Sequence, residues 1–168
     1  MNVRTAVESE IDLLARIWYD GWQDAHARLV PAELVRLRTL ESFRERLASA
    51  LPDVRVAGPV GAPVGFCMLK GDELYQLYVS AQARGSGVAA ALVADAEARL
   101  TDRGVGIAWL ACAMGNDRAA RFYEKCGWQR AGTVDYQPDG PAGIPPLVTW
   151  RYERRLHPSS PPAPRSKR

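Results

Sequence analysis

Residues 73–100, ELYQLYVSAQARGSGVAAALVADAEARL, decide the fold of this chain. The opening ELYQLYV is rich in aromatic and aliphatic residues and predicts a β-strand, whereas the alanine-rich end predicts a helix. Between them lie Arg84, Gly85 and Gly87. Each glycine costs about 1 kcal/mol relative to alanine if it falls within a helix. Two glycines at this junction therefore indicate that the backbone takes an unusual conformation or admits a close neighbour.

The chemistry of this junction suits a phosphate group. The first turn of a helix carries unpaired N–H groups and the positive end of the helix dipole. Arg84 adds a planar set of donors that matches phosphate oxygens. The alternative to a phosphate site is a plain strand-to-helix turn that needs two glycines. The surrounding sequence is needed to distinguish these interpretations.

Two familiar nucleotide-binding motifs do not fit the stretch. The Walker A pattern GxxxxGK[ST] is absent. The dinucleotide fingerprint GxGxxG/A matches formally at Gly85, Gly87 and Ala90, but it should directly follow its strand and precede an acidic residue by about 20 positions. Five residues separate Val79 from Gly85, and residues 105–114 contain no acid. These departures argue against a nicotinamide-dependent oxidoreductase.

Composition points to a single folded domain at 1–156 and a separate tail at 157–168. The chain has 168 residues, of which 47% are hydrophobic and 24% charged, as in ordinary globular proteins. Three basic residues of the Pro/Ser-rich tail account for the net charge of +3. We expect this tail to be disordered and the neutral body to bind no nucleic acid. No apolar run is long enough for a membrane span or an export signal, which predicts a cytoplasmic protein.

The cysteines and histidines offer little for metal or nucleophilic chemistry. Cys67, Cys112 and Cys126 are far apart, and we expect reduced, mostly buried thiols. The histidines are His26 and His157, the second of which lies in the tail. A His-built zinc site or a Ser-His-Asp triad would rest on one histidine, so we predict no metal.

Hydrophobic periodicity predicts a mixed α/β sheet around this stretch. Residues 3–7 suit a strand, 11–26 a helix, and 31–50 one helix or two. Three strands at 53–58, 64–70 and 73–79, separated by tight turns, predict an antiparallel meander. A helix from 87, a buried strand near 107–114, a helix from 116 capped by Asn116, and two final strands complete the series. The result is a mostly antiparallel sheet of about seven strands, with one parallel pair and about four flanking helices.

The stretch resembles the signature of the GNAT superfamily of N-acetyltransferases, [QR]-x-x-G-x-[GA], here Arg84 to Ala89. The downstream NDRAARFYEKCGW at 116–128 is similar to the family's Asn…FYEK-x-GF element, with Trp128 in place of phenylalanine. The helix IWYDGWQDAH and the helix after it also resemble the first two helices of small members. A proline that often follows the family's strand is Ala81 here, which should loosen that turn slightly.

The resemblance implies acetyl-CoA as cosubstrate. It implies that the end of strand 73–79 pairs with the pantetheine arm and that the amides of residues 84–89 hold the pyrophosphate. Asn116 would contact pantetheine or cap its helix. The implied cofactor-binding residues are Leu77, Tyr78, Val79, Arg84, Gly85, Ser86, Gly87, Val88, Ala89 and Asn116.

Direct attack of a primary amine on the thioester needs an acid and a base. Tyr123 would stand near the sulfur, and a neutral phenol can protonate the departing thiolate, so we assign it as general acid. Glu73 opens the strand that leads to the thioester and is the first candidate for the base and for contact with the substrate; the alternative is a solvated charge. His26 is a weaker candidate for the base, more typical of a partly buried helix residue.

The acceptor is expected to be a small-molecule or peptide amine. Trp22 follows Trp18 on one helix face and is expected to line the acceptor site, because aromatic faces attract cationic amines. The loop 137–146 is long enough to cover an acceptor, and nearby Asp135 and Asp139 favour a cationic one. A non-catalytic acyl-CoA-binding module with the same fold is the alternative function. A homodimer is compatible with the sequence.

Overall fold

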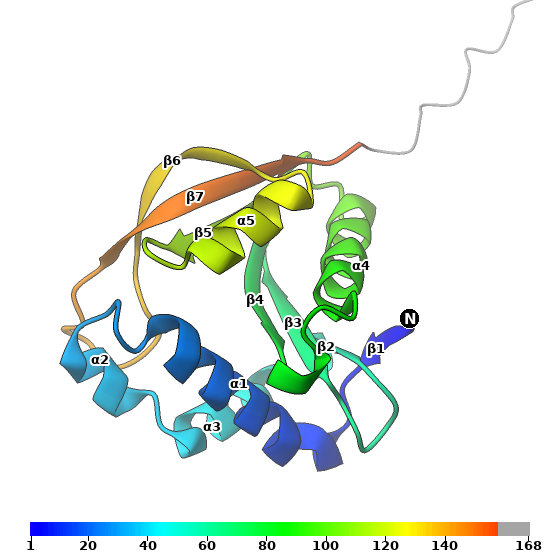
Figure 1. Cartoon of the computed structure of the whole chain (residues 1–168), viewed down its shortest axis with the longest axis horizontal. Coiled ribbons are helices and arrows are strands. Elements are labelled where there is room, and N and C mark those ends of the chain that lie inside the picture. Colours follow the sequence, from blue (N-terminus) through cyan, green and yellow to red (C-terminus); the bar gives the residue numbers. More distant parts are fainter. Residues whose placement is uncertain (158–168) are drawn as a thin grey trace, which may run out of the picture.

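The computed structural model describes residues 1–157, so nearly all of the predicted tail lies outside the described residues. The described chain forms a seven-stranded sheet in the order β1-β2-β3-β4-β5-β7-β6 (Figure 1). The strands are β1 (Val3–Thr5), β2 (Val54–Ala57), β3 (Gly65–Lys70), β4 (Glu73–Val79), β5 (Ile107–Ala113), β6 (Gln129–Tyr136) and β7 (Leu147–Arg155). The α-helices are α1 (Ile11–His26), α2 (Ala32–Leu37), α3 (Leu40–Ala50), α4 (Val88–Asp102) and α5 (Asp117–Lys125).

The sheet confirms the predicted topology. Strands β1 to β4 are successively antiparallel, and β5, β7 and β6 form a second antiparallel set. The two sets meet where β4 runs parallel to β5, which is the predicted parallel pair across α4. The segment 31–50 resolves into two helices, because Arg38 ends α2 and Thr39 caps α3 by accepting from the Ser42 amide.

The helices cover the sheet on both faces. A cluster containing Trp18, Phe43 and Phe66 joins α1, α2 and α3 to one face. A second cluster, with Leu92 of α4 and Trp128 after α5, fills the other face. Side chains on both faces of the central strands are therefore buried, each face in its own core, which accounts for the apolar sequences of these strands.

Strand β4 contains a bulge that changes which face its side chains occupy. Met68 of β3 pairs with Gln76, but the next residue, Leu69, pairs with Leu74, so Tyr75 has no direct partner in the β3–β4 register. Leu74 and Leu77 consequently both pack on the α4 side, although they are three residues apart. An extra residue of this kind bends the strand and strengthens its twist.

Strands β4 and β5 separate soon after they meet. Their register holds a single pair, Glu73 opposite Trp109, and the Trp109 amide donates to the Asp72 carbonyl at 3.2 Å. Figure 1 shows β3 and β4 running in a different direction from β5, β6 and β7. The edge of β4 that leads to Val79 is therefore left without a strand partner on the β5 side.

Candidate active site

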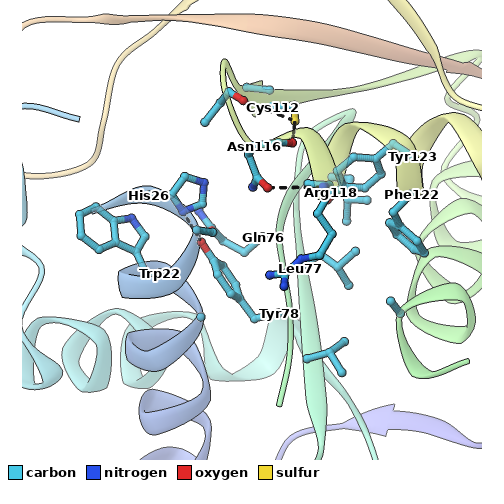
Figure 2. A pocket seen from close by; sticks show the side chains of 18 of the residues that line it. Trp22, His26, Gln76, Leu77, Tyr78, Cys112, Asn116, Arg118, Phe122 and Tyr123 are labelled. Atoms are coloured by element: carbon cyan, nitrogen blue, oxygen red, sulfur yellow. Dashed lines mark hydrogen bonds between the residues drawn. The ribbon is translucent and has the colours of Figure 1, made fainter. Parts of the chain in front are cut away.

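A cleft of about 780 Å³ opens where β4 and β5 separate. It extends from the first turn of α4 to the start of β4, and α1, α5 and the loop 137–146 complete its walls. Figure 2 shows Trp22 and His26 on one side, Phe122 and Tyr123 on the other, and Leu77 and its neighbours between them. Every site residue predicted from the sequence lines this cleft except Ser86.

The backbone conformation at the start of α4 requires its two glycines. Gly85 and Gly87 have φ values of 79° and 85°, a left-handed conformation that L side chains rarely adopt. A Cβ built on either glycine would meet no atom within 4 Å, so the space beside them is open. The glycines thus shape the turn and also leave room for a ligand at the N-terminus of a 15-residue helix.

The amides in this turn are not all free. Those of Arg84 and Ser86 donate to the carbonyl oxygens of Ala81 and Ala83, at 3.4 and 3.3 Å. The Ser86 hydroxyl also bonds to the Ala83 carbonyl. Gly85 and residues 87–89 line the cleft, so the part of the predicted cradle that faces it is smaller than the sequence suggested.

Arg84 is oriented by an acid that sequence reasoning did not single out. Asp24 of α1 accepts from the Arg84 guanidinium at 3.0 Å and from Arg118 of α5 at 3.3 Å. The hydrogen bond from Arg84, followed by that from Arg118, lowers the pKa of Asp24. Two cations therefore share one carboxylate at the edge of the cleft, which leaves positive charge near the start of α4. No local signal in the sequence pairs residues so far apart.

Asn116 and Tyr123 lie on the α5 wall. The Asn116 side chain accepts from the Ala119 amide at 3.4 Å, which confirms the predicted helix cap. Tyr123 packs against Trp128 and Tyr152, with ring centroids 6.3 Å away in each case. Burial, with a smaller contribution from Cys112, raises the pKa of Tyr123 well above its usual value. Its phenol is therefore protonated at physiological pH.

Glu73 is buried, with 6% of its surface exposed, and lines the cleft. Burial raises the pKa of Glu73 to about 7, while hydrogen bonding to Tyr136 acts in the opposite direction. The expected alternative, a solvated charge at a strand start, is therefore wrong. A carboxyl that titrates near neutral pH can exchange protons with a substrate under working conditions.

Trp22, Tyr78 and His26 line the α1 side of the cleft. The Tyr78 hydroxyl lies 3.3 Å from Nδ1 of His26 (Figure 2). Burial lowers the pKa of His26 to about 4, which makes its imidazole neutral and a weak base at pH 7. His26 is thus less suited than Glu73 to accept a proton from an ammonium group.

The end of the cleft near Glu73 is less acidic than predicted. Asp139 lies there, but Arg46 and Lys70 approach its carboxylate at 3.3 and 3.9 Å. Asp135 is exposed on β6 and does not line the cleft. Sequence reasoning missed Arg38 and Arg46, which both line it, because their pairing with the loop depends on contacts across about 100 positions of the chain.

The cysteines follow the prediction: Cys67 and Cys112 are buried and Cys126 partly so, and all three are free thiols. Burial raises the pKa of Cys67 to about 12 and that of Cys112 to about 11, so neither thiol ionises at neutral pH. Within residues 1–157, no group of three or more His, Cys, Asp or Glu side chains is arranged to hold a metal ion. None of the helices described is both long and apolar enough to cross a membrane.

The sequence profile of the Acetyltransferase (GNAT) family matches residues 9–128. The chain therefore belongs to the GNAT acetyltransferase family. An uncharacterized N-acetyltransferase of Mycobacterium tuberculosis strain H37Rv is 38% identical over 100 residues. That match spans 56% of this chain and 64% of the relative, so the chain covers less than two thirds of the relative's length.

Solved structures share the fold at low sequence identity. The crystal structure of a GCN5-related N-acetyltransferase from Rhodopseudomonas palustris is 23% identical, with a TM-score of 0.70 over 92% of this chain and 95% of that one. YncA of Salmonella typhimurium, solved with its cofactor acetyl-CoA, is 15% identical, with a TM-score of 0.62 over 96% and 97% of the two chains. Both structures support the mixed α/β fold with an open seven-stranded sheet.

Proposed function

We propose that this protein is an N-acetyltransferase that moves the acetyl group of acetyl-CoA to a primary amine. One observation carries the proposal: a single cleft joins the glycine turn at the start of α4, the unpaired edge of β4, Tyr123 and Glu73. Family membership and the acetyl-CoA bound to a protein of the same fold agree with this use of the cleft.

The cosubstrate would be held mainly by backbone groups. The pyrophosphate would lie against the first turn of α4, where residues 87–89 offer unpaired amides and Arg84 and Arg118 add positive charge. The pantetheine arm would run along the free edge of β4 near Leu77 and Val79, as an added strand does. Tyr78 and Asn116 would contribute to the walls on either side.

The reaction is a direct transfer. The amine nitrogen attacks the thioester carbonyl carbon, a C–N bond forms, and the oxyanion is held by amides of the strand near Leu77. The tetrahedral intermediate then collapses, the C–S bond breaks, and the electron pair leaves on sulfur. The Tyr123 hydroxyl gives its proton to that thiolate, and the former amine nitrogen releases its extra proton to water in the cleft, which yields coenzyme A and the N-acetyl product. The phenolate regains a proton from solvent before the next turnover.

Glu73 would handle the proton of the amine. An aliphatic ammonium must lose a proton before its nitrogen can attack. A carboxyl group with a pKa of about 7 is half ionised at pH 7, so it can accept that proton. Leu77 is four steps along the strand from Glu73, roughly 13 Å at 3.3 Å per residue. We therefore expect Glu73 to act through water in the cleft rather than by direct contact with the attacking nitrogen.

The proposal is tested by release of free thiol from acetyl-CoA in the presence of a panel of amines, peptides and amine antibiotics. Tyr123→Phe should lower kcat about 10²-fold and leave the KM for acetyl-CoA within about twofold, because it removes a proton donor and keeps the packing. Tyr19→Phe, at a partly buried position of α1 that does not line the cleft, is the matched control and should behave as wild type.

Two outcomes would contradict the proposal. Unchanged turnover in Tyr123→Phe would remove the acid role from Tyr123. Absence of thiol release with every acceptor, together with a melting temperature that acetyl-CoA still raises, would favour the non-catalytic acyl-CoA-binding module. If acetyl-CoA gave no stabilisation, the phosphate site at α4 would be wrong as well.

A further inference from the structure

The acceptor end of the cleft contains a buried cation without a counter-ion. Arg38, at the C-terminal end of α2, is only 6% exposed and lines the cleft. Its guanidinium donates to the backbone carbonyl of Asp139 at 2.6 Å. Among residues 1–157, no carboxylate lies within ion-pairing distance of it. Burying an unpaired guanidinium is costly, so such a group at the wall of a cavity indicates an anionic ligand.

A second guanidinium lies close to the first and is held rigidly. Arg46 of α3 stacks on the Trp18 ring, with Cζ 4.3 Å from the ring centroid, and donates to the Tyr75 hydroxyl at 2.9 Å. Its remaining partner is the Asp139 carboxylate, which Lys70 also approaches. Burial, followed by repulsion from Arg46, lowers the pKa of Arg38, while attraction to the Asp139 carboxylate acts in the opposite direction.

The charges in this part of the cleft do not balance. Arg38 and Arg46 face the carboxylate of Asp139 together with Glu73, which is only partly ionised at neutral pH. An acceptor that brought only an ammonium group would therefore enter a region of surplus positive charge. A carboxylate would instead supply the missing counter-ion, and guanidinium groups bind carboxylates in a planar, two-pronged geometry.

We propose that the acceptor is a primary amine that also carries a carboxylate, and that Arg38, supported by Arg46, binds this carboxylate. The amine would then extend toward Glu73 and the thioester, which the same cleft contains. A free amino acid and an acidic peptide share this chemistry. The inference rests on the proposed transferase function and specifies its substrate class.

The test uses pairs of acceptors that differ only in the carboxylate. Free amino acids are compared with their carboxamides, and 4-aminobutyrate with butylamine, by thiol release from acetyl-CoA. Tetrapeptides with an aspartate or an asparagine at the second position form the peptide arm. The acid of each pair should have the lower KM, by about 10- to 100-fold, as expected for a charge-assisted hydrogen bond. If the free amino acids show this difference in KM, the carboxylate belongs to an amino acid. If the tetrapeptides show it, the carboxylate belongs to an acidic peptide.

Arg38→Gln is the decisive variant, because glutamine keeps a donor for the Asp139 carbonyl and removes the charge. It should raise the KM for the acid about 10- to 100-fold, leave the KM for acetyl-CoA unchanged, and abolish the preference for the acid. Arg36→Gln, an exposed position on the same helix and outside the cleft, is the matched control and should retain the preference.

The outcomes separate this inference from the proposed function. Turnover of carboxamides and simple amines as fast as of acids, or an unchanged preference in Arg38→Gln, would overturn the carboxylate site and leave the transferase intact. If no acceptor is turned over, the same pairs are compared by the melting-temperature shift they cause with coenzyme A present. A shift caused by the acids and lost in Arg38→Gln supports the site, whereas equal shifts or none overturn it.

Discussion

At the scale of single residues, the environment of Glu73 determines its chemistry. Its sequence position, at the start of a strand, is equally compatible with a solvated charge. In the structure it is buried beside Tyr136, with its pKa raised to about 7. The same burial raises the pKa of Tyr123 and keeps its phenol protonated. One cleft thus contains a group suited to accept a proton at neutral pH and another suited to donate one.

We predict that kcat/KM rises with pH through about 7, because Glu73 must lose its proton before it can act as a base. Glu73→Gln should eliminate this step in the pH profile and lower kcat/KM about 10²-fold. The measurement is kcat/KM between pH 5.5 and 9, with Glu45→Gln, on the exposed side of α3, as the control. A profile that keeps its step near pH 7 in Glu73→Gln would assign the titration to another group.

At the scale of elements, the packing of α1 against β4 positions the acceptor side of the cleft. Gly21 of α1 lies so close to Tyr78 that a Cβ would be 2.6 Å from Cδ1 of the ring. That ring is also stacked on Phe66, with centroids 5.9 Å apart, so it has little room to move. Because Gly21 has no side chain, α1 can approach β4 closely. This close packing keeps Tyr78 near His26.

Gly21→Ala should therefore destabilise the protein, although alanine favours a helix by about 1 kcal/mol. Forcing a methyl group into a filled contact costs about 1–3 kcal/mol. We expect a net loss of about 1 kcal/mol in the free energy of unfolding and a raised KM for the acceptor. Urea denaturation measures the first effect. Gly106→Ala is the control, because a Cβ there would have no neighbour within 4 Å, and it should change stability by less than about 0.5 kcal/mol. Equal effects of the two substitutions would refute the close-packing argument.

At the scale of the whole molecule, one buried carboxylate ties together segments that are distant in the sequence. Glu10, which directly precedes α1, has a fully buried side chain and binds the Arg4 guanidinium of β1 at 2.6 and 3.1 Å. It also accepts from the amides of Val7 at 2.9 Å and Gly61 at 3.1 Å. These donors, the Arg4 hydrogen bond first, lower the pKa of Glu10 to about 2.

Acid should remove stability chiefly below pH 4.5. A carboxyl with a lowered pKa stabilises the folded state above its unfolded value near 4.5, so the contribution of Glu10 is lost as pH falls from 4.5 to 2. At higher pH two groups act in opposite directions: the lowered pKa of His26 removes stability between about 6.5 and 4, whereas the raised pKa of Glu73 adds stability as pH falls from about 7 to 4.5. Glu10→Gln should cost about 3 kcal/mol at pH 7 and flatten the loss of stability below pH 4.5. Unfolding free energies measured from pH 7 to 3 provide the test, and Glu8→Gln, an exposed neighbour, should keep that loss. An unchanged loss below pH 4.5 in Glu10→Gln would assign it to another group.

The elements and the glycine turn at the start of α4 could be predicted from the sequence, because both depend on local patterns. Periodicity predicted the helices and strands. The glycines at 85 and 87 indicated an unusual backbone conformation before α4, and in the structure this turn is left-handed. Asn116 capped its helix as expected, since a cap is satisfied within three residues. The signature at 84–89 and the element at 116–128 were sufficient to indicate the family.

The sequence alone therefore predicted the sheet, the helices around it and the special turn at the start of α4. The end of the cleft near Glu73 is known only from the folded chain, where Arg38 meets the Asp139 carbonyl and Arg46 meets its carboxylate. Those contacts join positions 101 and 93 residues apart. The charge balance of a cavity is the sum over side chains from separate elements, and burial then sets their pKa values. Neither quantity is encoded in any local stretch of the chain.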